Sequence, residues 1–138
     1  MPVPEPGTLV RTHAQLARMW RGLMGRGGFG TSTLWLVFFD AESRVHPVIL
    51  PIDDVPPEPD VQFVHNLAQL VGSLVNGEGV ASVALLLSRP GPHAMTEADR
   101  RWARSLRAAF GEHATWPMHL ATADQVQVFA PDDLMAAS

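Results

Sequence analysis

The stretch from Ser82 to Trp102 constrains the fold of this chain more than any other part of the sequence. It begins with an apolar run of strand length, continues through the loop Pro90-Gly91-Pro92, and reaches Thr96-Glu97-Ala98-Asp99. A threonine followed three residues later by an acidic side chain is typical of a helix N-terminus, where both side chains satisfy free backbone N–H groups. The stretch therefore predicts a buried strand, a tight loop and a capped helix over 97–110.

The rest of the chain predicts three further helices, the last of them short, and four further strands. Thr12 and Gln15 form a capping-box pattern ahead of an apolar stripe, which indicates a helix over 12–24. Apolar runs indicate a hairpin of strands over 33–39 and 45–50, then a loop over 51–60 and a helix capped by Asp60 that ends at 76–79. The central strand is expected over 80–88, two short strands over 115–121 and 125–129, and a short last helix from 131. The order is α-β-β-α-β-α-β-β, an α/β fold with a mixed sheet.

Length and composition limit the classes of protein that this chain can belong to. A chain of 138 residues is the size of one domain, so we expect a single domain over 1–138 with a flexible N-terminal segment over 1–11. There is no cysteine, which excludes disulfides and thiol catalysis. The net charge is −4 and every basic residue except histidine is an arginine, which argues against nucleic acid as a partner. No signal peptide or membrane span is predicted, so we expect a soluble cytoplasmic protein.

The strand, loop and helix over 81–110, together with the hairpin Leu36-Val-Phe-Phe-Asp-Ala-Glu-Ser-Arg-Val45, resemble the RadC-like branch of the JAB/MPN metallohydrolases. The resemblance implies a three-layer sandwich of the cytidine-deaminase-like kind. It also implies a zinc site with two histidines at the end of the central strand and an aspartate in the capped helix. Leu86 and Ser88 stand at the histidine positions, and only Asp99 matches. Since leucine cannot ligate zinc, we expect a relative without metal or other cofactor.

Two functions of different class follow from these residues. The first is a non-catalytic interaction or scaffold module that associates with itself or with a protein partner, most simply as a homodimer. The second is a hydrolase with a relocated site built from Ser88, His93, Asp99 and His119. His93, His113 and His119 could also converge on Asp99 as a different metal site, although none is at the short spacing that places two ligands on one element. We favour the non-catalytic module.

Three other patterns are open to a functional interpretation. The outer face of the helix over 97–110 carries four arginines, namely Arg100, Arg101, Arg104 and Arg107. They could bind an acidic partner or phosphates, although a solvated helix face is the simpler interpretation. The sequence from Gly25 to Gly30 matches GxGxxG but follows a helix and precedes a strand, the reverse of the dinucleotide-binding context. Pro56-Pro-Glu-Pro59 matches PxxP within an acidic connector, where we expect a stiff loop.

Overall fold

The computed structural model describes residues 7–24, 31–77, 79–111, 116–123 and 125–130. Within them lie the helices α1 (His13–Met24), α2 (Val61–Gly77) and α3 (Glu97–Phe110). The strands are β1 (Thr33–Phe39), β2 (Val45–Asp53), β3 (Ser82–Ser88), β4 (His119–Ala121) and β5 (Val126–Val128). The predicted α/β class with a mixed sheet is confirmed, and these elements follow one another as α-β-β-α-β-α-β-β.

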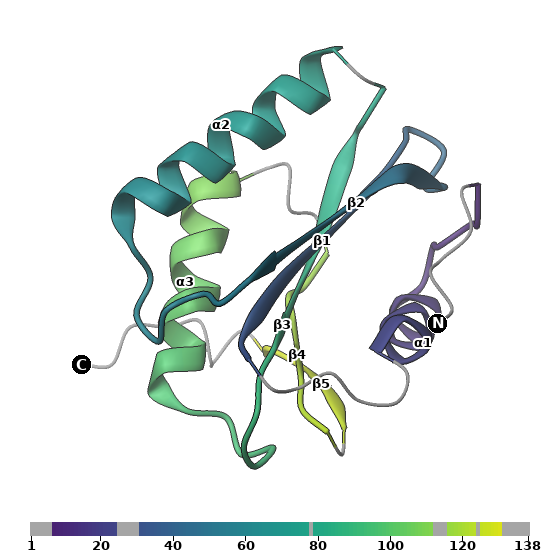
Figure 1. The fold of residues 1–138 in the computed structure, drawn as a ribbon. Helices are drawn as coiled ribbons and strands as arrows, with labels where there is room; N and C mark the ends of the chain where they lie inside the picture. The colour runs from purple at the N-terminus through teal and green to yellow at the C-terminus, as the bar shows by residue number, and fades with distance from the viewer. Residues whose placement is uncertain (1–6, 25–30, 78, 112–115, 124, 131–138) are drawn as a thin grey trace.

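The five strands form one sheet in the order β2-β1-β3-β4-β5 (Figure 1). β1 is antiparallel to both β2 and β3, and β4 is antiparallel to β5. Only β3 and β4 run parallel, and α3 connects them, as parallel neighbours require a crossover. The carboxyl ends of β3 and β4 therefore lie side by side at the same end of the sheet, beside the loop that leads into α3.

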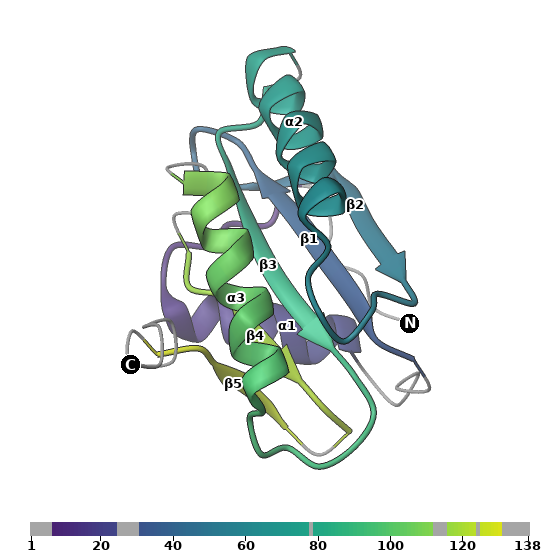
Figure 2. The same cartoon turned by 90° about the vertical axis from the view of Figure 1, so that its left-hand side faces the viewer.

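Helices cover both faces of the sheet, so the molecule has three layers: α2 and α3 lie on one face and α1 on the other (Figures 1 and 2). Alternation along the strands divides the apolar side chains between two cores. Leu85 and Leu87 of β3 face α2 and α3, where Trp102 and Leu106 of α3 are also buried. Leu86 faces the other way and packs in the core that α1 closes.

The sheet edge at β2 is covered in part by the chain that precedes α1. The Gly7 N–H donates to the Val45 carbonyl and the Val45 N–H donates to the Thr8 carbonyl, each at 2.8 Å. Val10 is buried in the core under α1. Residues 7–10, which belong to the segment predicted to be flexible, are thus attached to the hairpin. None of the helices in the described part of the chain has the length and hydropathy that a membrane span requires.

Several predicted boundaries differ from the structure. β2 continues to Asp53, although its residues after 50 were predicted to be a loop, because an edge strand tolerates prolines such as Pro51 that a central strand excludes. β3 begins at Ser82 rather than at residue 80, and β5 covers only 126–128. β4 covers 119–121, the three residues that pair in register with both β3 and β5. The glycine-rich pattern over 25–30, His113 and the helix predicted from 131 lie outside the described residues.

The packing around Trp102 generates a prediction about stability. Its ring is 2% exposed, lies edge-on to Phe63 with ring centroids 6.0 Å apart, and its Nε1–H donates to the Pro56 carbonyl at 2.9 Å. Trp102→Ala removes this ring and leaves a cavity, so we expect the free energy of unfolding to fall by about 3–5 kcal/mol in denaturant melts. Val61→Ala is the control, because Val61 is 84% exposed and should change stability by less than about 0.5 kcal/mol. Equal effects of the two changes would contradict this packing.

Candidate functional site

The loop between β3 and α3 is built around the side chain of Arg89, the first residue after β3. All five guanidinium N–H groups are used. Nε and Nη2 donate to the two carboxylate oxygens of Asp99, each at 2.8 Å. The remaining N–H groups donate to loop carbonyls at 2.9–3.0 Å, namely those of Pro90, Pro92 and Ala94. A guanidinium with this many partners fixes the path of the loop, and we call this arrangement the Arg89 clasp.

Asp99 connects the Arg89 clasp to the first turn of α3. Its carboxylate accepts the Thr96 N–H at 2.8 Å, and its own N–H donates to the Thr96 hydroxyl at 3.1 Å. This is a capping box, as the sequence predicts, with Thr96 as the N-cap. Asp99 is 3% exposed. Its buried charge is therefore balanced by Arg89 and by a backbone N–H, and neither carboxylate oxygen lacks a partner.

Ser88, the last residue of β3, lies on the opposite side of the strand from Leu87 and faces the α1 layer. Its hydroxyl accepts the Nε1–H of Trp35 at 3.0 Å and lies 3.4 Å from the Thr33 carbonyl, to which it donates. The side chain is buried. A serine nucleophile needs a base within hydrogen-bond reach of its hydroxyl. Here the described partners of that hydroxyl are an indole and a carbonyl, neither of which accepts a proton at neutral pH.

His119 lies on β4, where it pairs in register with Leu86 and shares the face that α1 covers. It is 4% exposed. Burial lowers the pKa of His119 from 6.5 to about 4, against a hydrogen bond to the Pro117 backbone that raises it. The charges of His13 and Arg21 on α1 lower it further. Its Nδ1 has no hydrogen-bond partner within the described residues. This imidazole is therefore neutral and enclosed at physiological pH.

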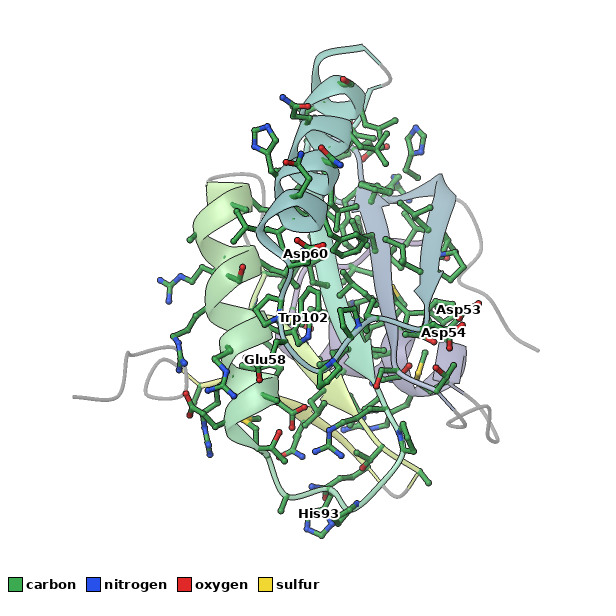
Figure 3. The ribbon with its side chains drawn as sticks, turned by 60° about the vertical axis from the view of Figure 1, so that its left-hand side comes forward. Asp53, Asp54, Glu58, Asp60, His93 and Trp102 are labelled. Atoms are coloured by element: carbon green, nitrogen blue, oxygen red, sulfur yellow. The ribbon has the colours of Figure 1, made fainter. Side chains whose placement is uncertain are left out.

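His93 is exposed at the outer end of the loop, away from Trp102 and the body of α3 (Figure 3). Its carbonyl accepts a hydrogen bond from the Gln127 side chain, which attaches the loop to β5. The candidate residues thus lie in three different surroundings. Ser88 and His119 belong to the α1 face, Asp99 belongs to the start of α3, and His93 belongs to the loop surface.

The residues at the end of β3 do not fit the zinc site that the family resemblance implies. Leu86 is fully buried in the apolar core, Ser88 is bonded to Trp35, and Asp99 has Arg89 where a metal would be. A zinc ion bound by Asp99 would meet the guanidinium charge at the same oxygens, which is repulsive. No group of three histidine, aspartate or glutamate side chains in the described ranges could hold a metal ion.

The arginines on the outer face of α3 are largely paired with acidic side chains. Arg101 contacts Glu58 at 2.7 Å and Arg104 contacts Glu97 at 2.6 Å, while Arg100 lies 3.9 Å from Glu97. The hydrogen bond from Arg104 is the main cause that lowers the pKa of Glu97. Arg107 is exposed and forms no ion pair with a described residue. The positive charge of this face is thus mostly balanced within the molecule.

Two residues that organise this region were missed by sequence reasoning. Arg89 is ten residues from Asp99, a spacing that corresponds to no helix or strand period, so no pattern pointed to the pair. Trp35 was assigned only to an apolar strand, although its indole N–H is a donor that needs a partner when it is enclosed. The available signal for the Arg89 clasp was a single arginine at the start of the Pro/Gly loop, together with the helical spacing that places Asp99 on the same face of α3 as Trp102 and Leu106.

No known family model matches this sequence, and no curated protein matches it significantly.

The Arg89 clasp generates a prediction about the pairing of Arg89 with Asp99. Arg89→Lys keeps the charge but cannot supply five N–H groups in a plane, so loop carbonyls and part of the Asp99 carboxylate lose their donors. We expect a loss of about 1–3 kcal/mol in the free energy of unfolding, the usual cost of leaving enclosed hydrogen-bonding groups without a partner. Arg107→Lys is the matched control and should be neutral within about 0.5 kcal/mol. Denaturant melts of both variants measure the difference, and a neutral Arg89→Lys would contradict the clasp.

His119 generates a prediction about pH. The folded protein keeps His119 neutral down to about pH 4, whereas the unfolded chain binds this proton near 6.5. The unfolded state therefore binds more protons between these values, so stability is complete above 6.5 and is lost as the pH falls towards 4. At about 1.4 kcal/mol per pKa unit, the loss has an upper bound of about 3 kcal/mol.

Melts of His119→Leu between pH 4 and 7 test the assignment of this proton. We expect the variant to lose the pH-dependent decline that the unmodified protein shows in this range. His13→Asn should keep it, because His13 is exposed and contributes only a smaller charge effect. An unchanged decline in His119→Leu would assign the proton to a different group.

Proposed function

We propose that this protein is a non-catalytic protein-interaction module, a metal-free relative of the JAB/MPN domains of the RadC-like branch. The observation that supports this most directly is the Arg89 clasp. In the family that the sequence resembles, the aspartate of the capped helix is a ligand of the metal. In this chain, the matching Asp99 is occupied by a guanidinium from the preceding loop. The Asp99 carboxylate thus stabilises the loop through its bonds to Arg89.

The surroundings of the other candidate groups also favour binding over catalysis. A hydrolytic site needs a nucleophile, a base and a donor for the developing oxyanion within reach of one substrate atom. The Ser88 hydroxyl is bonded to Trp35, the neutral His119 is enclosed under α1, and His93 lies on the loop surface. These groups would have to leave their present partners before they could act together.

The partner that suits this surface is a protein. The chain carries a net charge of −4, and every arginine of α3 except Arg107 lies beside Glu58 or Glu97, so a polyanion would meet no extended positive surface in the described part of the chain. The loop held by the Arg89 clasp offers exposed prolines and His93 in a fixed conformation. Fixing a surface loop before binding lowers the entropy that association costs.

Metal analysis and a substrate screen test this proposal together. We expect the purified protein to retain less than about a tenth of a zinc ion per chain after dialysis, because Arg89 competes for Asp99. We also expect no turnover of peptidase, esterase or nucleotide-hydrolase substrates. Ser88→Ala and Asp99→Asn serve as the matched variants for any activity that is found.

Turnover that both variants abolish would overturn the proposal in favour of a hydrolase at the end of β3. One zinc per chain that survives dialysis would overturn the metal-free assignment. Activity that co-purifies with the chain and persists in both variants would also overturn the non-catalytic assignment, because the site would then lie elsewhere in the protein.

A further inference from the structure

The pairing of β5 with β4 determines which backbone N–H and C=O groups of β5 point to the outer side of the sheet. The Thr122 N–H donates to the Gln125 carbonyl and the Phe129 N–H donates to the Met118 carbonyl, each at 2.9 Å. In an antiparallel ladder, hydrogen-bonded pairs alternate with pairs that are not bonded to each other. The N–H and C=O groups of Gln127 therefore face β4, and those of Val126 and Val128 face away from the sheet.

Within the described residues, the opposite edge of the sheet is protected in a way that β5 is not. Val45 of β2 is paired on its outer side with residues 7 and 8, and Pro47 and Pro51 have no N–H to donate. The register between β1 and β2 also shifts between Val37 and Phe39. Prolines, bulges and covering segments are the devices by which edge strands avoid pairing with other chains. The segment 126–128 has no proline or charge, and no described residue pairs with its outer side.

We propose that β5 is the self-association surface of this protein, where two copies pair β5 against β5 in antiparallel fashion and join their sheets. The proposal rests on the interaction function proposed above and identifies the partner as a second copy of the chain. A two-fold axis at Gln127 sets Val126 of each copy opposite Val128 of the other. The outward N–H and C=O groups of these residues then form four main-chain hydrogen bonds across the axis.

The sequence of β5 favours a second copy over an unrelated strand. Val126-Gln127-Val128 reads the same in both directions, so antiparallel pairing sets valine against valine on one face and glutamine against glutamine on the other. β-branched pairs across strands are stabilising. One N–H of the Gln127 amide is bonded to the His93 carbonyl, and its second N–H and its oxygen can donate to and accept from the twin amide. The strand carries no charge, so two copies with net charge −4 each meet at a neutral segment.

The exposure of the two valines agrees with a partner on this side. Val128 is 45% exposed and is one of only three exposed large apolar side chains among the described residues. Val126 packs partly against the core under α1. Three strand residues span only about 10 Å. The interface is therefore small, and we expect a reversible dimer with a Kd in the micromolar range or weaker, as for interfaces at the low end of the size range.

The test is analytical ultracentrifugation of the full chain from about 1 μM to about 1 mM, a range that brackets the expected Kd. We expect the weight-average mass to rise from monomer towards dimer with concentration. Val128→Lys should weaken the dimer at least about tenfold, because an edge lysine would have to be dehydrated beside the partner strand. Val128→Thr is the matched control and should dimerise like the unmodified chain, since threonine is also β-branched.

Val128→Pro tests the backbone bonds separately from the side chain. It removes an N–H that faces away from β4, so the sheet of the monomer keeps its ladder and the melting temperature should change little. The dimer should lose two of its four main-chain hydrogen bonds and dissociate. A chain that is monomeric throughout the range overturns this inference while leaving the metal and activity tests of the proposed function unaffected. A dimer that persists in both the lysine and the proline variants also overturns it, because the contact must then lie elsewhere.

Discussion

The pairing of the Arg89 guanidinium with the Asp99 carboxylate determines how the central part of this molecule is connected. Arg89 directly follows β3 and joins it to three further segments. Its N–H donates to the Ala121 carbonyl of β4, and its side chain binds the loop carbonyls and the start of α3. The parallel pair β3 and β4 and the helix that connects them are thus fixed relative to one another at a single point. A polar pair of this kind is stable in a buried position only when every donor and acceptor has a partner, and here all five guanidinium N–H groups do.

The two faces of the sheet keep the polar groups of the region apart. Because side chains alternate along β3, Ser88 falls on the same face as Leu86 and beneath the α1 layer, whereas α3 and its Asp99 belong to the other layer. His119 takes its face from its register with Leu86. A shift of one residue in either strand would exchange these faces. The separation of the serine and the histidine from the aspartate is therefore a consequence of strand register, which also explains why residues that lie close in the sequence do not form one site.

Hydrophobic periodicity and capping patterns were enough to predict the three described helices and the mixed α/β class, because the physical cause of each element lies within it. The stripe of Leu16 and Trp20 indicated α1, and the Thr96 cap indicated the start of α3. What could not be predicted depends on partners distant in the sequence. β2 continues through Pro51 because it is an edge strand, and β4 comprises the three residues that pair with both β3 and β5. In the candidate site, the bonds of Ser88 to Trp35 and of Asp99 to Arg89 arise from tertiary placement, so the sequence could supply the candidate residues but not their surroundings.

The unequal protection of the two sheet edges limits how large an assembly of these chains can become. If both edges were open, each added copy would present a new edge, and growth would continue into a fibre. With β2 blocked by its prolines and by residues 7 and 8, a pair joined through β5 has blocked strands at both outer ends. An interface in which each copy uses the same surface is complete when two copies have bound. If two copies pair through β5 as proposed, the protection of β2 limits the assembly to two chains and prevents polymerisation.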